Sequence, residues 1–172
     1  LKNPADEAMP SANAIASMAL LKLGRLTGNK IYTEKSEETI KAFQAFVEDS
    51  PAAFTGLLAT QSASSLSPTE AIFTGPKESA EFDDMWKVLH TDYRPNKVVI
   101  WNEKGESTLP LAEGKTSSEP TVYLCQKGTC HPPVNTSKAL DRLLERPQEI
   151  RLNIFDENKK NAQILGDEQN NF

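Results

Sequence analysis

A strand, a helix and a second strand follow one another between residues 70 and 101, and this order restricts the fold more than any other feature. The first strand is the apolar run 70–74, which Gly75-Pro76 closes. The second strand, Lys97–Trp101, is rich in β-branched residues. Between them, apolar residues recur at helical spacing, namely Phe82, Met85, Trp86 and Leu89. Such a unit predicts a parallel pair of strands joined by a right-handed crossover.

The first 66 residues carry helix signals instead. Ser11 follows Pro10 and is a good N-cap, because its hydroxyl can accept a hydrogen bond from an unpaired helix amide. Gly28 suits the left-handed position after a helix end. Apolar residues lie on nearly every side of the helix between these two positions: Ile15, Met18, Ala19, Leu21 and Leu23. This pattern predicts a buried helix rather than a surface helix.

A second helix is predicted over residues 33–48, with Ile40, Phe43 and Val47 on one face and charged residues on the other. A third helix is predicted to begin at Pro51, because proline is favoured in the first turn of a helix. An apolar helix followed by an amphipathic one is the pattern expected for an inner and outer pair in a helical barrel.

The small-residue linker 62–68 separates these helices from the rest of the chain. Beyond the strand-helix-strand unit we expect a polar loop (103–119), a strand (Thr121–Cys125), a helix (135–146), a strand (Arg151–Phe155) and a polar tail (156–172). The predicted fold class is α/β. Its parts are a helical segment (1–66), a small, mostly parallel sheet of three or four strands with flanking helices (67–155), and the tail.

Composition narrows the range of partners. The formal net charge is −5, which argues against nucleic acid and against an anionic membrane surface. No apolar run approaches the roughly 20 residues that a membrane span needs. Asp6 and Glu7 stand where a secretory signal would be basic, and two cysteines are too few for a disulfide scaffold, so we expect a cytoplasmic protein. Because Leu1 is no natural initiator, we expect a piece of a longer protein.

Cys125 and Cys130 are the only two cysteines, and they can form a disulfide, act in redox chemistry, bind a metal or do none of these. Zinc would need a fourth ligand beyond His131, and His90 is the only other histidine. Redox catalysis favours C-x-x-C at a helix N-terminus, whereas this spacing is longer and Pro132-Pro133 follows. Ordinary structural cysteines are the favoured interpretation, and a dithiol switch is the alternative. No catalytic residue, metal or cofactor is predicted.

Two stretches resemble one known family. They are D-E-A-M-P-S-A-N at residues 6–13, with the Ala- and Leu-rich helix after it, and Y-L-C-x4-C-x-P at residues 123–132, preceded by Gly114-Lys115. Both resemble the spermatogenesis-associated, YyaL-type thioredoxin-domain-containing proteins, and the resemblance covers about residues 4–146. It implies a thioredoxin-like domain, then an (α/α) toroid similar to N-acylglucosamine 2-epimerases, then a small α/β region. The chain would then hold the end of the toroid and the α/β region.

The resemblance leads to three hypotheses about function. The first is a non-catalytic C-terminal region that completes and supports the toroid, with the rest of the parent protein as its partner. The second is a redox switch at Cys125 and Cys130. The third is sugar or polyol binding in the toroid by four residues near the first helix, Asp6, Glu7, Ser11 and Asn13. The alternative for these four is that Ser11 caps the helix and the acids are solvated.

Overall fold

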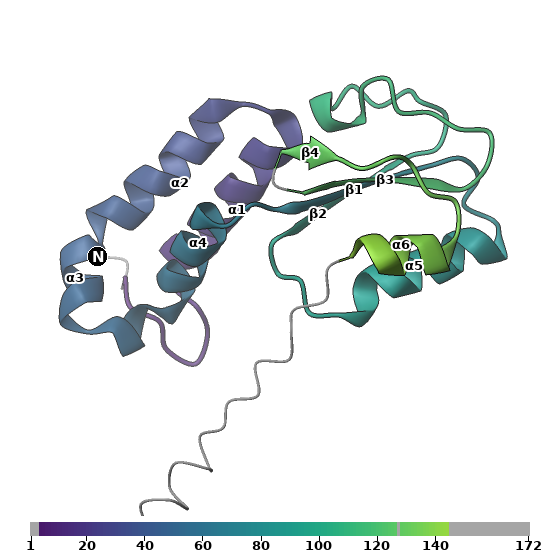
Figure 1. The fold of residues 1–172 in the computed structure, drawn as a ribbon. Helices are drawn as coiled ribbons and strands as arrows, with labels where there is room; N and C mark the ends of the chain where they lie inside the picture. The colour runs from purple at the N-terminus through teal and green to yellow at the C-terminus, as the bar shows by residue number, and fades with distance from the viewer. Residues whose placement is uncertain (1–3, 127, 145–172) are drawn as a thin grey trace, which may run out of the picture.

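The computed structural model describes residues 4–126 and 128–144 (Figure 1). Its elements, in chain order, are α1 (Ala12–Thr27), α2 (Lys30–Ala42), α3 (Gln44–Asp49), the 3₁₀ turn η1 (Pro51–Phe54), α4 (Thr55–Ser65), β1 (Thr69–Thr74), α5 (Ala80–Thr91), β2 (Lys97–Asn102), the 3₁₀ turn η2 (Pro110–Ala112), β3 (Thr121–Gln126), β4 (Thr129–Cys130) and α6 (Ser137–Leu143). The predicted α/β class, with helices first and then a small sheet, is confirmed. The predicted strand 151–155 and tail 156–172 lie outside the described residues.

The first helix begins and ends where its capping residues predict. Ser11 Oγ accepts a hydrogen bond from Ala14 N at 3.2 Å, and Gly28 follows the helix with a φ of 67°. The predicted second helix is divided in two, because Phe43 leaves helical geometry with φ −108° and ψ 6°. Capping and termination in this part of the chain are therefore local effects of the sequence, apart from the break at Phe43.

α1 packs against α2 and α4 through small side chains. Its buried residues are Ala14, Ser17, Leu21 and Gly24. A Cβ on Gly24 would lie 2.3 Å from Thr33 Oγ1, so the close approach of α1 to α2 requires glycine. Ser17 Oγ lies 3.3 Å from Thr60 Oγ1 of α4, and Ser36 Oγ of α2 donates to Ser17 O at 2.7 Å. These buried hydroxyls all have partners within the contact between the helices.

The prediction that the first helix is buried is wrong for this chain. Five apolar residues of α1 are exposed at a spacing of three or four, and we call them the α1 stripe: Ala12, Ile15, Ala16, Ala19 and Leu23. Ile15 is 58% exposed and Leu23 is 43% exposed. Ala14, Ser17 and Gly24 permit close packing on α2 and α4, with Leu21 buried beside them, and Ile15 and Leu23 remain exposed on the other side of the helix.

The sheet has the strand order β2-β1-β3-β4. β1 and β2 are parallel and are connected through α5, which confirms the strand-helix-strand prediction. β3 runs antiparallel to β1, and β4 runs antiparallel to β3, so the sheet is mixed rather than mostly parallel. The reason is that the loop from β2 to β3 holds only the short η2. Thr121, the first residue of β3, pairs with Thr74, the last residue of β1, so the chain re-enters the sheet at the end it left.

Helices cover one face of the sheet and a loop covers the other (Figure 1). The core under α5 and α6 comprises Ala71, Phe73, Phe82, Met85, Leu89, Val122, Leu124, Leu140 and Leu144. On the opposite face Ile72, Ile100 and Cys125 pack with Ala112 of η2 and with Leu26 of α1. Leu26 thus packs the helical part of the chain against this face of the sheet. Within the described ranges, no helix combines the length and the apolar character needed to span a membrane.

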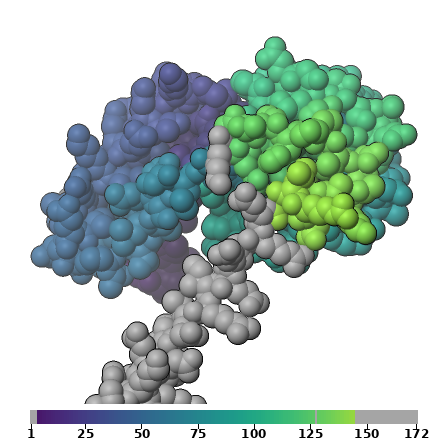
Figure 2. Space-filling model, in the orientation of Figure 1, coloured from purple at the N-terminus to yellow at the C-terminus, as the bar shows by residue number. Residues whose placement is uncertain are grey.

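Arg25, in the last turn of α1, connects the helical part to the α/β part. Its Nη2 donates to Ala63 O at 2.6 Å and to Leu66 O at 3.2 Å, at the end of α4. Its Nη1 donates to Asn96 Oδ1, and Asn96 Nδ2 donates to Leu66 O at 3.0 Å. Figure 2 shows the two parts as lobes that lie side by side. One guanidinium therefore holds α1, α4 and the loop before β2 together.

Replacing Arg25 with alanine tests this connection. We expect Arg25→Ala to lower the free energy of unfolding by about 2 kcal/mol, because hydrogen bonds from a charged donor are lost. Urea denaturation measures the change. Lys22→Ala removes the same charge from the exposed side of the same helix and should stay within about 0.5 kcal/mol of the original chain. Equal effects of the two substitutions would contradict the role given to Arg25.

Candidate functional site

The two cysteines face each other across the hairpin formed by β3 and β4. Cys125 pairs with Cys130 in the antiparallel register, with Gly128 in the turn at a φ of 74°. Their Cα atoms lie 3.9 Å apart, and the two sulfurs form a disulfide. Because each sulfur is bonded to the other, neither is available as a metal ligand in this state. Within the described residues, no group of three or more metal-ligating side chains comes together.

The two sulfurs have different surroundings. Cys125 is 3% exposed and belongs to the apolar cluster with Ile72 and Ile100, whereas Cys130 is exposed on the edge strand β4. Cys130 is therefore the solvent-exposed member of the pair. Sequence spacing alone does not distinguish the two cysteines.

Glu70 of β1 lies opposite Cys125 in the strand register. Burial raises the pKa of the Glu70 carboxyl, while the charges of Arg25 and Lys115 act in the opposite direction. A half-buried acid beside the disulfide had no signal in the sequence, because the pairing of β1 with β3 is a long-range contact. The register therefore brings together a carboxyl and a disulfide that lie 55 residues apart in the chain.

The four candidate residues near the first helix separate into two kinds. Asp6 and Ser11 are brought together, since Ser11 N donates to Asp6 Oδ1 at 2.8 Å. Asp6 Oδ2 accepts from Gly56 N at 2.7 Å and from Thr55 Oγ1 at 3.0 Å, at the start of α4. Asp6 thus caps α4 and ties the N-terminal segment to it. Glu7 is exposed, and Asn13 is half-buried in the first turn of α1.

This arrangement favours the structural alternative for these residues. Both Asp6 oxygens and the Ser11 hydroxyl already accept backbone or side-chain hydrogen bonds within the fold. The role of Ser11 as a helix cap was predicted correctly. The role of Asp6 was not, because its partners at residues 55 and 56 are distant in sequence.

Asp6 gives a prediction about pH. Burial acts to raise the pKa of Asp6, but hydrogen bonds from Gly56, Ser11 and Thr55 outweigh it and hold the pKa below its ordinary value. A carboxyl whose pKa is lower in the folded state stabilises the fold above the unfolded pKa of about 3.9 and loses that effect as pH falls through the folded value. We therefore expect Asp6→Ala to lower the free energy of unfolding by about 1 kcal/mol at pH 7, and by progressively less below about pH 4.

Thermal or urea unfolding between pH 3 and pH 7 measures this difference. Glu7→Ala is the matched control, since it removes the neighbouring, exposed carboxylate. A loss of stability in Asp6→Ala that does not change with pH would argue against the ionised carboxylate as the cap.

The disulfide gives a second prediction. Reduction should lower the free energy of unfolding by about 2 kcal/mol, a modest loss because the closed loop is short. In reducing buffer, Cys125→Ser should cost about a further 1 kcal/mol by placing a hydroxyl in an apolar cluster, while Cys130→Ser should be nearly neutral. Urea denaturation with and without dithiothreitol measures both effects. Equal effects of the two serine substitutions would contradict the asymmetry of the site.

Comparisons with known proteins place the chain among its relatives. It is 26% identical over 151 residues to spermatogenesis-associated protein 20 of Homo sapiens, which is 84% of this chain and 19% of that protein. The protein of the same name from Mus musculus is 27% identical over 153 residues, 85% of this chain and 19% of that protein. No family model and no solved structure matches. The resemblance found in the sequence is thus confirmed: the chain is similar to the spermatogenesis-associated protein 20 proteins and spans about a fifth of their length.

Proposed function

We propose that this chain is a non-catalytic C-terminal region that completes and supports the helical toroid of a larger protein. The α1 stripe carries the proposal. Ile15 and Leu23 expose large apolar side chains in one line, although the helix has a well-packed opposite face. Contiguous exposed apolar residues mark contact surfaces between proteins or domains. A preceding helix of the toroid would cover this stripe and restore the buried environment that its composition predicts.

Two further observations support the proposal. Other large apolar side chains are exposed on the same helical part, where Met9 is 77%, Ile31 59% and Phe46 56% exposed. The curated relatives are also several times longer than this chain, which spans 19% of their length. The proposed partners are the thioredoxin-like domain and the rest of the toroid, in the cytoplasm.

An association experiment tests the proposal. Residues 1–172 and the preceding part of the full-length protein are produced as separate chains, and their binding is measured by calorimetry. We expect a one-to-one complex, and the double substitution Ile15→Gln with Leu23→Gln should weaken it at least about a hundredfold, because two buried apolar side chains are lost.

The matched control places two glutamines on the polar face of α2, through Glu34→Gln and Glu37→Gln, both at exposed positions. This variant should bind as the original chain does. Failure of the two parts to associate, or equal weakening by both pairs of substitutions, would overturn the proposal.

A dithiol switch at Cys125 and Cys130 is the second candidate function. The observation that favours it is the exposure of Cys130 beside a buried Cys125. A thiolate from a small thiol or from a partner protein attacks the Cys130 sulfur and forms a mixed disulfide. The Cys125 thiolate leaves, and a second thiol then displaces Cys130 from the mixed disulfide, so both cysteines are reduced while the two external thiols are oxidised to a disulfide. Reduction would free the β3–β4 hairpin from its cross-link, next to the point where Leu26 of α1 meets the sheet.

Equilibration with glutathione buffers, followed by alkylation and mass spectrometry, measures the potential of this pair. A switch should have its midpoint in the cytosolic range, about −220 to −320 mV. A disulfide that stays closed throughout this range would be structural. Sugar or polyol binding by Asp6, Glu7, Ser11 and Asn13 is not proposed further, because the hydrogen bonds of Asp6 and Ser11 explain those two residues.

A further inference from the structure

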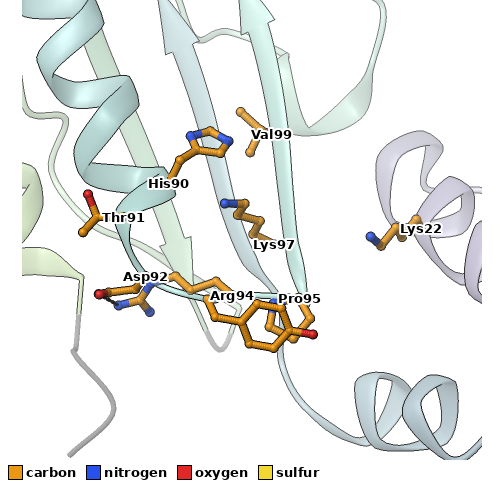
Figure 3. Close-up of a pocket in the computed structure, with 9 residues that line it drawn as sticks. Lys22, His90, Thr91, Asp92, Arg94, Pro95, Lys97 and Val99 are labelled. Carbon is orange, nitrogen blue, oxygen red and sulfur yellow. Dashed lines mark hydrogen bonds and ion pairs between the residues drawn. The ribbon is translucent and has the colours of Figure 1, made fainter. Parts of the chain in front are cut away.

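A cavity of about 610 Å³ lies between the end of α5, the start of β2 and the exposed side of α1 (Figure 3). Its lining comprises Lys22, His90, Thr91, Asp92, Tyr93, Arg94, Pro95, Lys97 and Val99. The volume lies within the range of small-molecule sites, about 300–1,000 Å³. Neither the cysteines nor Asp6, Glu7, Ser11 and Asn13 line it, so the cavity is separate from both the disulfide and the N-terminal loop.

Basic side chains line this cavity on opposite walls. Lys22 extends into it from α1, while the Lys97 ammonium lies toward the end of α5 and the Arg94 guanidinium lies beside Asp92 (Figure 3). Asp92 is the one carboxylate among these lining residues, and its Oδ2 lies 3.3 Å from Arg94 Nη2. The charges of Lys22 and Lys97 are therefore not balanced within the lining. This concentration of positive charge is notable because the whole chain carries a net charge of −5.

The electrostatic surroundings of Lys97 are also consistent with excess positive charge at this cavity. Burial lowers the pKa of Lys97, and the positive charges of Arg94 and Lys22 lower it further. The positive charges of Arg94 and Lys22 therefore act unfavourably on the charged form of Lys97. Lys97 Nζ also lies 3.4 Å from Leu89 O, so it offsets the partial negative charge at the end of α5. An anion between the two walls would relieve the repulsion.

The walls are held in place by contacts already described. Arg25 lies one turn after Lys22 on α1 and donates to Asn96, the residue that precedes Lys97. The hydrogen bonds of Arg25 with the end of α4 hold the same helix from the other side. The spacing of Lys22 and Lys97 is therefore set by a fixed connection between the lobes, as a preorganised site requires.

We propose that this cavity binds the phosphate group of a small organic phosphate ester. A phosphate dianion matches the two lysine charges, and its several oxygens can accept more than one charge-assisted hydrogen bond. A carboxylate carries a single charge and two oxygens, which suits the site less well. Tyr93 is 88% exposed at the rim and, with Pro95, offers apolar surface to the organic part of the ligand.

A titration of the 172-residue chain with phenyl phosphate tests the proposal, with amide NMR shifts as the readout and ionic strength held constant with sodium chloride. We expect saturable shifts at residues 90–99 and around Lys22. Lys22→Gln and Lys97→Gln should each weaken binding about tenfold, because each removes one charge-assisted contact. Benzoate should bind at least about tenfold more weakly than phenyl phosphate.

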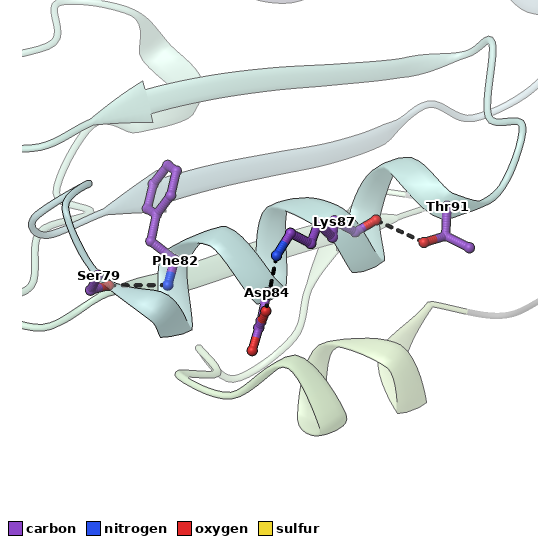
Figure 4. A network of polar contacts seen from close by, with 5 residues as sticks. All are labelled: Ser79, Phe82, Asp84, Lys87 and Thr91. Atoms are coloured by element: carbon purple, nitrogen blue, oxygen red, sulfur yellow. Dashed lines mark hydrogen bonds and ion pairs between the residues drawn. The ribbon is translucent and has the colours of Figure 1, made fainter.

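Lys87→Gln is the matched control, since it removes one positive charge from α5 outside the cavity. Lys87 is exposed and pairs with Asp84 at 3.4 Å (Figure 4). This variant should bind phenyl phosphate as the original chain does. Lys22 is exposed, so Lys22→Gln should fold normally even if Lys97→Gln, at a half-buried position, does not.

Three results would overturn the proposal: shifts spread over lysines elsewhere on the surface, equal weakening by all three lysine substitutions, or benzoate binding as tightly as phenyl phosphate. A titration with inorganic phosphate separates binding of the phosphate group by the lysines from binding of the organic group by Tyr93. Inorganic phosphate should bind at the same residues and should be unaffected by Tyr93→Ala, whereas phenyl phosphate should bind Tyr93→Ala more weakly. Loss of inorganic phosphate binding in Tyr93→Ala would contradict the role given to the ring.

Discussion

The hydrogen bonds of Arg25 connect the helical part of the chain to the α/β part. Its guanidinium contacts the end of α4 and the loop before β2, where the helical part meets the sheet. A charged group with several donors in a fixed plane is suited to bind carbonyls from separate segments. Leu26, which packs on the sheet, and Lys22, which lines the cavity together with Lys97, lie within one turn of Arg25 on the same helix. Loss of this connection would affect fold and cavity together.

The close packing of α1 on α2 and α4 leaves large apolar side chains of this helix exposed. Gly24 and Ser17 allow the backbones of α1, α2 and α4 to approach, and Ile15 and Leu23 remain exposed in the α1 stripe. An isolated protein gains nothing by exposing Ile15 and Leu23 to water. The proposed contact with a preceding helix of the toroid would cover both side chains. This argument links the packing of one helix to the proposed place of the chain in a larger assembly.

The candidate sites differ in how far the sequence could predict them. The pairing of Cys125 with Cys130 is local, so proximity of the two sulfurs followed from the spacing, although their unequal exposure did not. The capping role of Ser11 is also local. Asp6 acts on α4 across 50 residues, and Lys22 and Lys97 line one cavity only because the two lobes are in contact. Such contacts have no signature in a single sequence, because they depend on how separate elements pack.

The sequence by itself determined the order of helices and strands, the ends of α1, the parallel pairing of β1 and β2, and the resemblance to a known family. These features depend on capping residues, short apolar runs and motifs within a few residues of one another. The tertiary structure alone decided the antiparallel return of β3, the exposed face of α1, the capping role of Asp6 and the basic cavity. Each of these depends on which surfaces come into contact, and that choice belongs to the packing of the whole chain.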